Sequence, residues 1–459
     1  MNIPRLVFAE EKRAKKISAG ILLASVLKGI GRPIRLFSAC YDEQFVRYAE
    51  LVTGQEVTIL NPFTCGSSRN MKLLFQQASS PDALNIVFGS LGERQEIDSF
   101  TVNQLTGEVA RILDCPVVLS VYADSSTAIT SKILESITQQ MSTQGAQPSA
   151  VLFSSVFNPR EYQLLEIESG RRTEMLYLGY IPKTMEKDES SLLELCMPDM
   201  AQRAVFPIKA ATAQITGMLN QVEWDVLWGL AKKSPEWSVV SDPMKGKGGG
   251  VKVGILSNPA FGLGGNNAEL LFRYLGCSVR TVPLDGAAPD PKLDALYVPH
   301  APGFLCAERL LGKSGIRDWF LSFFSRKPVL VGGGVAPLLG ESFSLPNDKR
   351  YEGLKLFPFQ GLFKIPSSVD SRLVEAVSSF GEDIMLNRGE KIRGYIPGYL
   401  SIRDPGNTAG ASWSVVNPNK SADIGLSGWC KGPSIVTEIC LELWSNMEGV
   451  HRWLMMRKA

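Results

Sequence analysis

The stretch 328–343, PVLVGGGVAPLLGESF, constrains the fold more than any other part of this sequence. Pro328–Val331 is a short apolar run that predicts a buried strand. Three glycines follow, and an apolar segment that we expect to be helical comes next. A buried strand that turns sharply into a helix is the geometry of a nucleophile elbow, which presents one side chain on a strained turn. The residue at the tip would be Gly333, so the expected elbow carries no nucleophile.

The first half of the chain alternates short apolar runs with helix-like segments. The predicted strands are residues 6–9, 33–37, 84–88, 116–121, 150–153 and 176–178, and predicted helices include 17–30 and 45–52. Continuous Val, Ile and Leu runs separated by helices are typical of a parallel sheet that is covered on both faces. We therefore predict a doubly wound α/β fold.

The length of 459 residues suggests two domains. The clearest boundary is the glycine-rich segment 241–250, because glycine favours a flexible chain with little secondary structure. Apolar runs restart after it at 251–256, 278–283 and 293–298, with a predicted helix at 268–274. The sequence therefore predicts a first domain at 1–240, a linker at 241–250 and a second α/β domain at 251–459.

Composition excludes several classes of function. Lys and Arg number 48 against 46 Asp and Glu, and a net charge of +2 gives no electrostatic case for nucleic acid. No apolar run approaches the roughly 20 residues of a membrane span, and the N-terminus lacks a signal-peptide pattern, so we expect a cytoplasmic protein. The eight cysteines show no metal-ligand spacing and the histidines are His300 and His451, so no metal is expected.

The first strand-to-helix loop is where a doubly wound domain would hold phosphate. A P-loop needs glycines there, followed by Lys and Ser or Thr. Lys15 stands at the position of the lysine, but Lys16 replaces the hydroxyl residue and no glycine is present. Glu10 and Glu11 would repel a triphosphate. A solvated, charged start of a helix is favoured over a working nucleotide loop, and neither ATP nor magnesium is expected.

Several motifs resemble those of the cobyrinic acid a,c-diamide synthase family. They are Leu339–Ser342 (LGES), Leu178–Pro182 (LGYIP) and Asp294–Val298 (DALYV). The resemblance implies an N-terminal P-loop NTPase-like, dethiobiotin synthetase-like domain. It implies a C-terminal class I glutamine amidotransferase-like domain, which is flavodoxin-like. The nucleophilic cysteine of the family falls on Gly333.

Other functional positions of the family are also changed. The resemblance places the family's catalytic histidine on Gly398, and a terminal pair of histidines near Cys440 and Glu442. An acidic Glu-Gly pair of the family falls on Phe88 and Gly89, whereas Asp42 preserves one acidic position. The oxyanion loop reads Pro299-His300-Ala301-Pro302-Gly303, in which both prolines lack an N–H. The resemblance therefore implies a divergent member with degenerate catalytic motifs.

The remaining candidates are ligand-binding residues. His300 could act as a base, but a base without a nucleophile has nothing to activate. The glycine cluster 262–265 could cradle an anion, although a flexible loop is the favoured interpretation. The ligand-binding candidates are His300, Gly262, Gly264, Gly265, Asn266 and Tyr399.

Three hypotheses follow from this combination of retained scaffold and lost chemistry. The leading one is a pseudoenzyme of cobalamin or tetrapyrrole metabolism that binds a tetrapyrrole, a related acidic metabolite or a catalytic partner. The second is an ATP-dependent amidoligase that uses free ammonia and a loop around Lys15. The third is a structural subunit, as a homodimer or as a heteromer with an active homologue, whose interaction face is the aromatic C-terminal segment 443–456.

Overall fold

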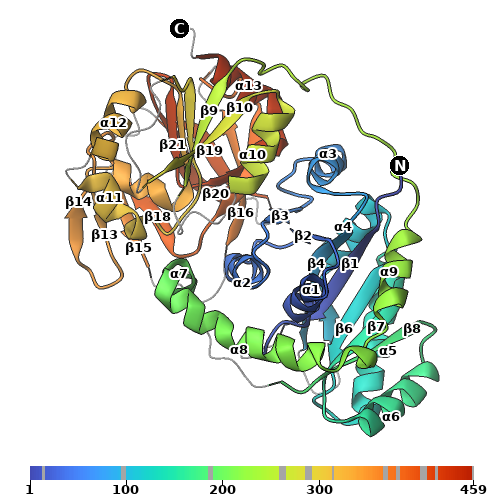
Figure 1. Cartoon of the computed structure of the whole chain (residues 1–459). Coiled ribbons are helices and arrows are strands. Elements are labelled where there is room, and N and C mark those ends of the chain that lie inside the picture. The colour runs from blue at the N-terminus through green and yellow to red at the C-terminus, as the bar shows by residue number, and fades with distance from the viewer. Residues whose placement is uncertain are drawn as a thin grey trace. The chain divides into compact units, whose positions relative to one another are not determined.

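The structure is a computed structural model, and it divides into two compact units (Figure 1). Unit 1 is Met1–Pro62 with Ala78–Val240, and unit 2 is Phe63–Gln77 with Ser241–Ala459. The described residues are 1–12, 16–94, 100–184, 190–257, 265–284, 292–312, 315–364, 371–378, 383–403, 411–418 and 422–456. Both units are α/β, and the predicted fold class is confirmed.

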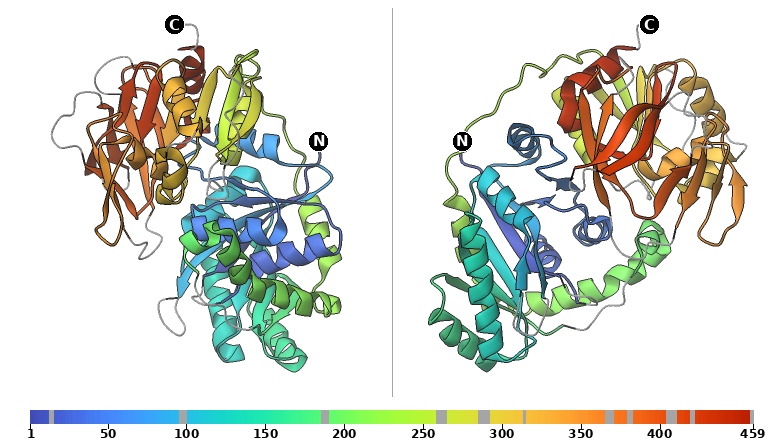
Figure 2. Two further views of the ribbon diagram at one scale, coloured as in Figure 1. Left: turned by 60° about the vertical axis from the view of Figure 1, so that its left-hand side comes forward. Right: turned by 180° about the vertical axis from the view of Figure 1, so that it is seen from behind.

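Unit 1 is built on a sheet with the strand order β3-β2-β4-β1-β6-β7-β8. These strands pair in parallel, and the short β5 pairs antiparallel with β4. The strands are β1 (Arg5–Glu11), β2 (Ile34–Ser38), β3 (Val57–Ile59), β4 (Leu84–Arg94), β5 (Phe100–Val102), β6 (Val117–Tyr122), β7 (Pro148–Val156) and β8 (Leu176–Pro182). The continuous apolar runs of the sequence form this sheet because both of its faces are covered by helices (Figure 2).

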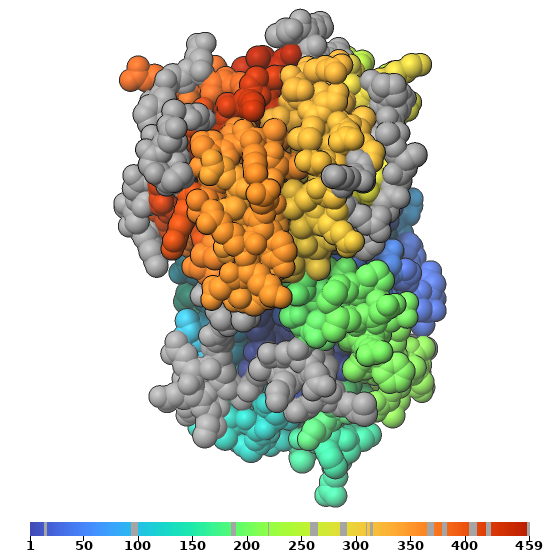
Figure 3. All heavy atoms as spheres, turned by 90° about the vertical axis from the view of Figure 1, so that its left-hand side faces the viewer, coloured from blue at the N-terminus to red at the C-terminus, as the bar shows by residue number. Residues whose placement is uncertain are grey.

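Several helices of unit 1 begin at side-chain caps. Ser18 caps α1 by accepting a hydrogen bond from the Ile21 amide, and Asp42 caps α2 in the same way for Phe45. The helices are α1 (Ala19–Gly29), α2 (Glu43–Thr53), α4 (Gln104–Leu113), α5 (Thr127–Thr143), α6 (Pro159–Gly170), α7 (Leu192–Cys196), α8 (Pro198–Thr216), the 3₁₀ helix η1 (Leu219–Gln221) and α9 (Trp224–Lys232). The outer surface of α8 is seen in green in the space-filling view (Figure 3).

Unit 2 contains a ten-stranded sheet with the order β10-β9-β11-β12-β21-β20-β19-β16-β17-β22. The half from β10 to β21 is parallel, and the half from β21 to β22 is antiparallel. The strands are β9 (Lys252–Ser257), β10 (Ser278–Pro283), β11 (Ala295–Val298), β12 (Val329–Gly332), β16 (Arg372–Ser378), β17 (Lys391–Ile396), β19 (Ala411–Asn417), β20 (Ala422–Lys431), β21 (Ser434–Thr437) and β22 (Cys440–Glu442).

A smaller sheet in unit 2 has the order β14-β13-β15-β18. Its strands are β13 (Ser342–Ser344), β14 (Arg350–Glu352), β15 (Gln360–Phe363) and β18 (Leu400–Arg403). The helices of unit 2 are α3 (Ser68–Ala78), α10 (Gly265–Tyr274), η2 (Gly303–Leu305), α11 (Ala307–Leu311), α12 (Gly315–Phe324), η3 (Gly333–Leu339), η4 (Leu443–Asn446) and α13 (Met447–Met455). The helix expected after the glycines is the 3₁₀ helix η3, which contains Pro337.

The segment 63–77 belongs to unit 2 although unit 1 surrounds it in the sequence. The Arg393 guanidinium donates to the carbonyl of Phe63 at 3.1 Å and lies 4.8 Å from the centre of its ring. The side-chain Nδ2 of Asn70 donates to the carbonyl of Trp444 at 2.9 Å. The glycine-rich segment is also bonded to this unit, because the Gly246 and Gly248 amides donate to carbonyls at the end of α10. No described helix is long and apolar enough to cross a membrane.

Glu50 gives unit 1 a predictable response to pH. Its side chain is 12% exposed, and its carboxylate accepts a hydrogen bond from the Val57 amide at 3.3 Å. Burial raises the pKa of Glu50 from 4.5 to about 7, against the opposing effects of the Val57 amide and Arg47. A raised pKa means that the contribution of this group to stability is complete below pH 4.5 and is lost as pH rises through 7.

We expect Glu50→Gln to remove this pH dependence. Between pH 4.5 and 8 the free energy of unfolding of the wild type should fall by about 3 kcal/mol more than that of the variant. Urea unfolding at a series of pH values measures the difference, and the exposed Glu108→Gln serves as the control. Parallel pH curves for wild type and Glu50→Gln would contradict the prediction.

Candidate functional site

The predicted phosphate position of unit 1 is occupied by the carboxylate of Glu10. Glu10 lies near the end of β1, and its two oxygens accept hydrogen bonds from the amides of Ala19 at 2.7 Å and Gly20 at 3.1 Å. The Ser18 hydroxyl donates to the same carboxylate at 2.6 Å and the Tyr122 hydroxyl at 3.3 Å. Three donors at the start of α1 therefore point at one carboxylate of the chain itself, together with the Tyr122 hydroxyl of β6, which also lies 3.2 Å from the carbonyl of Ile17.

This arrangement is that of an anion-binding site whose anion is internal. The first amides of a helix have no partner within the helix and favour negative charge. Burial raises the pKa of Glu10, while the bonds from Ser18, Gly20, Ala19 and Tyr122 act in the opposite direction. A phosphate could reach these amides only after the Glu10 carboxylate had left them. The carboxylate therefore blocks this phosphate position.

An aromatic ring lies beside the start of α1, at the position where the resemblance implies a carboxylate. Phe88 is buried at 4% exposure and packs edge-on against Phe45, with 5.2 Å between ring centres. A Cβ atom on Gly20 would lie 2.8 Å from the Phe88 ring, so α1 can begin against this ring because residue 20 is glycine. Apolar packing therefore holds the start of α1 against Phe88.

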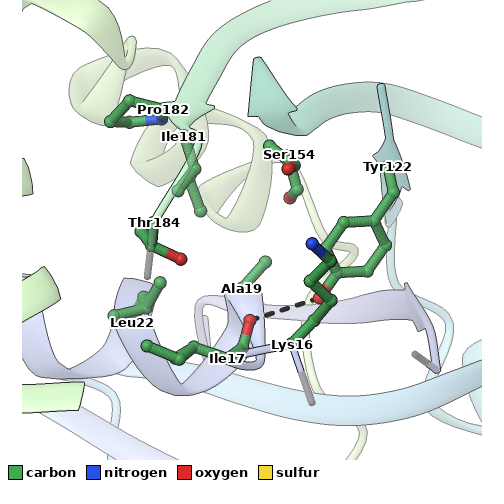
Figure 4. A pocket seen from close by; sticks show the side chains of 10 residues that line it. Lys16, Ile17, Ala19, Leu22, Tyr122, Ser154, Ile181, Pro182 and Thr184 are labelled. Atoms are coloured by element: carbon green, nitrogen blue, oxygen red, sulfur yellow. Dashed lines mark hydrogen bonds between the residues drawn. The ribbon is translucent and has the colours of Figure 1, made fainter. Parts of the chain in front are cut away.

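The predicted nucleotide-binding residues have separate places in unit 1. Lys15 lies outside the described residues. Lys16 lines a small pocket with Tyr122, which is drawn in Figure 4. Asp42 caps α2 and also accepts an ion pair from Lys12 at 2.6 Å, so its carboxylate already has two partners.

In unit 2 the strand β12 ends in the expected elbow. Gly333 follows the last residue of β12 and has a φ of +66°, a left-handed conformation that strains any side chain. Its amide donates to the carbonyl of Ile439 at 3.2 Å. The conformation predicted for the tip of the elbow is confirmed, and no side chain extends from it.

His300 fills the space that a side chain on the elbow would need. A Cβ on Gly333 would overlap His300 Nδ1 and would lie 2.7 Å from Cys440 Sγ. His300 is 3% exposed, and its Nδ1 accepts a hydrogen bond from the Gly334 amide at 2.9 Å. Because Nδ1 is an acceptor, the neutral ring carries its proton on Nε2, which lies 2.9 Å from the hydroxyl of Tyr399.

The loop that carries His300 is pressed against the elbow backbone. A Cβ on Gly334 would overlap the carbonyl of Ala301, and one on Gly303 would overlap the carbonyl of Gly334. In an oxyanion hole the amides must face the position of a substrate oxygen. Here the Gly334 amide faces His300 instead, so the histidine acts as the internal partner of the elbow.

Cys440 and Glu442, near which the resemblance places a terminal pair of histidines, both lie on β22, and Cys440 lies beside the elbow. The two residues alternate along β22 and therefore point to the same face of the sheet. Glu442 is buried at 5% exposure and accepts a hydrogen bond from the Asn267 side chain at 2.7 Å.

The other predicted ligand-binding residues are dispersed along unit 2. Gly265 and Asn266 begin α10, and Gly262 and Gly264 lie outside the described residues. Gly398 is exposed in the turn before Tyr399. Among the described residues, no group of three or more His, Cys, Asp or Glu side chains is placed to hold a metal ion.

Comparisons with known proteins give distant matches in fold. No protein-family model matches the chain, and no curated protein does. PurLQS from Thermotoga maritima is 11% identical, with a TM-score of 0.33, over 45% of this chain and 96% of that one. Chloroplast FtsY from Physcomitrella patens is 10% identical, with a TM-score of 0.29, over 42% and 61%. The MinC:MinD cell division complex of Aquifex aeolicus is 11% identical, with a TM-score of 0.27, over 46% and 95%. Similarity at this level carries no argument about activity.

Gly333→Ala should destabilise unit 2 more than its backbone conformation alone requires. Gly389 is the matched control, since its φ is +79° and a Cβ there would have no described neighbour within 4 Å. Both substitutions carry the left-handed penalty of about 1–2 kcal/mol. Overlap with His300 should add about 1–3 kcal/mol at Gly333.

Urea unfolding measures this difference, and a double-mutant cycle with His300→Ala identifies its source. In the His300→Ala background, the cost of Gly333→Ala should fall toward that of Gly389→Ala. Equal costs for the two glycine substitutions in the wild-type background would show that His300 does not fill the elbow.

Glu10→Gln should destabilise unit 1 although it preserves the shape of the side chain. An amide offers one oxygen and adds an NH₂ group, so it cannot accept from all four donors. We expect the free energy of unfolding to fall by about 1–3 kcal/mol at pH 7. Hydrogen exchange should localise the loss to the first turn of α1, and unchanged exchange there would refute the role of Glu10.

Proposed function

We propose that this chain is a non-catalytic protein of the cobyrinic acid a,c-diamide synthase type that binds an acidic tetrapyrrole. The observation that carries the proposal is the Glu10 carboxylate on the amides of Ala19 and Gly20. An ATP-dependent ligase would need those amides for phosphate. Here the Ala19 and Gly20 amides are bonded to the Glu10 carboxylate.

The elbow of unit 2 supports the same conclusion independently. Glutamine hydrolysis requires a nucleophile with a base beside it and donors for the oxyanion. Gly333 supplies no nucleophile, and the Gly334 amide is bonded to His300. The two units therefore lack two different steps of one reaction.

The ligand class comes from the motifs that resemble the family, chiefly Leu339–Ser342 and Leu178–Pro182. Tetrapyrrole acids carry several carboxylates around a large apolar ring. A protein that keeps the scaffold and loses both chemical steps retains binding as its function. A role in tetrapyrrole metabolism follows from this proposal.

Three measurements on the full chain test the proposal. Calorimetric titration with MgATP should give no saturable heat, and incubation with glutamine should release no ammonia. Uroporphyrin should quench the tryptophan fluorescence of the protein saturably, whereas its neutral octamethyl ester should not. The ester is the matched control because it keeps the ring and removes the charges.

Two results would overturn the non-catalytic assignment. One is ammonia released from glutamine by the pure protein. The other is ADP formed from ATP in the presence of ammonia and uroporphyrin, which would identify an amidoligase that uses free ammonia. Absence of quenching by uroporphyrin would reject the ligand class and leave the assignment of the two closed sites intact.

A further inference from the structure

The strand β14 forms one edge of the small sheet of unit 2 (Figure 1). It consists of Arg350, Tyr351 and Glu352, and all three residues are exposed. β13 pairs with it on one side, and no described strand pairs with it on the other. An open strand edge presents backbone N–H and C=O groups that can pair with a further strand.

The hydrogen bonds beside β14 show which of its backbone groups point outward. The carbonyl of Lys349 accepts from the residue opposite it at 2.9 Å, and the Gly353 amide donates to the residue opposite it at 3.0 Å. In an antiparallel pair, residues bonded to the partner strand alternate with residues whose backbone groups point away from it. The backbone of Tyr351, midway between these two residues, therefore faces β13. The amides and carbonyls of Arg350 and Glu352 face the open edge.

The order of the side chains on β14 is complementary to itself. If a second copy of the chain pairs antiparallel about a two-fold axis at Tyr351, Arg350 of each copy lies opposite Glu352 of the other. The same register brings the outward backbone groups of these residues face to face, where each pair can exchange two N–H···O bonds. Opposite charges directly across two strands stabilise the pairing, and like charges destabilise it. The register that satisfies the backbone is therefore also the register that matches the charges.

The contacts that the two charged side chains make within their own chain are compatible with this pairing. Arg350 Nε donates to the Ser342 hydroxyl at 2.9 Å, a bond that uses one of the five N–H groups of the guanidinium. Glu352 forms an ion pair with Lys355 at 3.1 Å, and these side chains are 81% and 58% exposed. An exposed ion pair contributes little to stability, so an arginine across the strand can replace it.

A row of aromatic rings crosses the small sheet and ends at Tyr351. Phe363 packs edge-on against Phe343 with 6.0 Å between ring centres, and Tyr351 stacks on Phe343 at 5.6 Å. Phe343 is 2% exposed and Phe363 is fully buried, whereas Tyr351 is 43% exposed. On the two-fold axis the tyrosines of the two copies would form a non-hydrogen-bonded pair, in which side chains lie closest. Such a cross-strand aromatic pair is stabilising and would continue the row of rings.

We propose that β14 is a contact between two copies of this chain, which pair antiparallel about a two-fold axis at Tyr351. The small sheets of the two copies then form one continuous sheet. The same surface of both copies makes the contact, as in most homodimers. Because the strand is short, the contact area is below that of stable dimers and the association is weak. The proposal assigns a surface to self-association and does not rest on the tetrapyrrole binding proposed above.

Sedimentation velocity of the full chain, from about 5 to about 500 µM, measures this association. We expect a monomer–dimer equilibrium with a dissociation constant on the order of 100 µM. A protein that stays monomeric over this whole range would overturn the proposal.

Charge reversals test the register of the pairing. Arg350→Glu and Glu352→Arg each place like charges across the two-fold contact, so each variant should associate at least about tenfold more weakly than the wild type. The double variant Arg350→Glu/Glu352→Arg restores opposite charges and should dimerise like the wild type. Glu108→Arg is the matched control on α4, because it makes the same change of charge at another exposed position and should leave the association unchanged.

A mixture of the two singly reversed proteins gives the sharpest result. In a mixed pair every charge again lies opposite its complement, so Arg350→Glu and Glu352→Arg proteins should form a heterodimer at a concentration where each alone is monomeric. Circular dichroism of each variant checks that it is folded. A wild-type dimer that neither reversal weakens, or a mixture that stays monomeric, would overturn the pairing at β14.

Discussion

The contact between Glu10 and the first turn of α1 is the interaction that holds the start of this helix in unit 1. The amides at the start of a helix must find a partner, because a buried donor without one costs about 1–3 kcal/mol. In a phosphate-binding loop that partner arrives with the ligand. Here the Ala19 and Gly20 amides have found a permanent partner in the preceding strand. The first amides of α1 therefore have a hydrogen-bond partner within the chain.

In unit 2 the backbone amide that follows the strand is bonded to the imidazole of His300. The elbow exposes the Gly334 amide at the end of a buried strand, and His300 Nδ1 accepts from it. Tyr399 holds the other ring nitrogen, so the histidine is fixed at both ends. In both units, therefore, backbone amides that follow a buried strand are bonded to side chains of the chain itself.

Much of the scaffold could be predicted from local sequence patterns, and part of it could not. The parallel strands were predictable because a strand buried on both faces is a continuous apolar run, as in β1 and β6. Strands such as β14 cannot be predicted in this way, because they are short and exposed and lack such a run. Segment 63–77 was assigned to the first domain, and its inclusion in unit 2 depends on distant partners such as Arg393.

The sequence by itself determined two local features: the segment 8–18 contains no glycine, and Gly333 stands at the tip of the elbow. Both features can be read from the residue types at single positions next to a predicted strand. Only the tertiary structure decided what fills the two sites. His300 is 34 residues from Gly334 and 99 from Tyr399, and Tyr122 is 112 from Glu10. Such partners are brought together by strand order and by the close approach of glycine backbones, which no local pattern encodes.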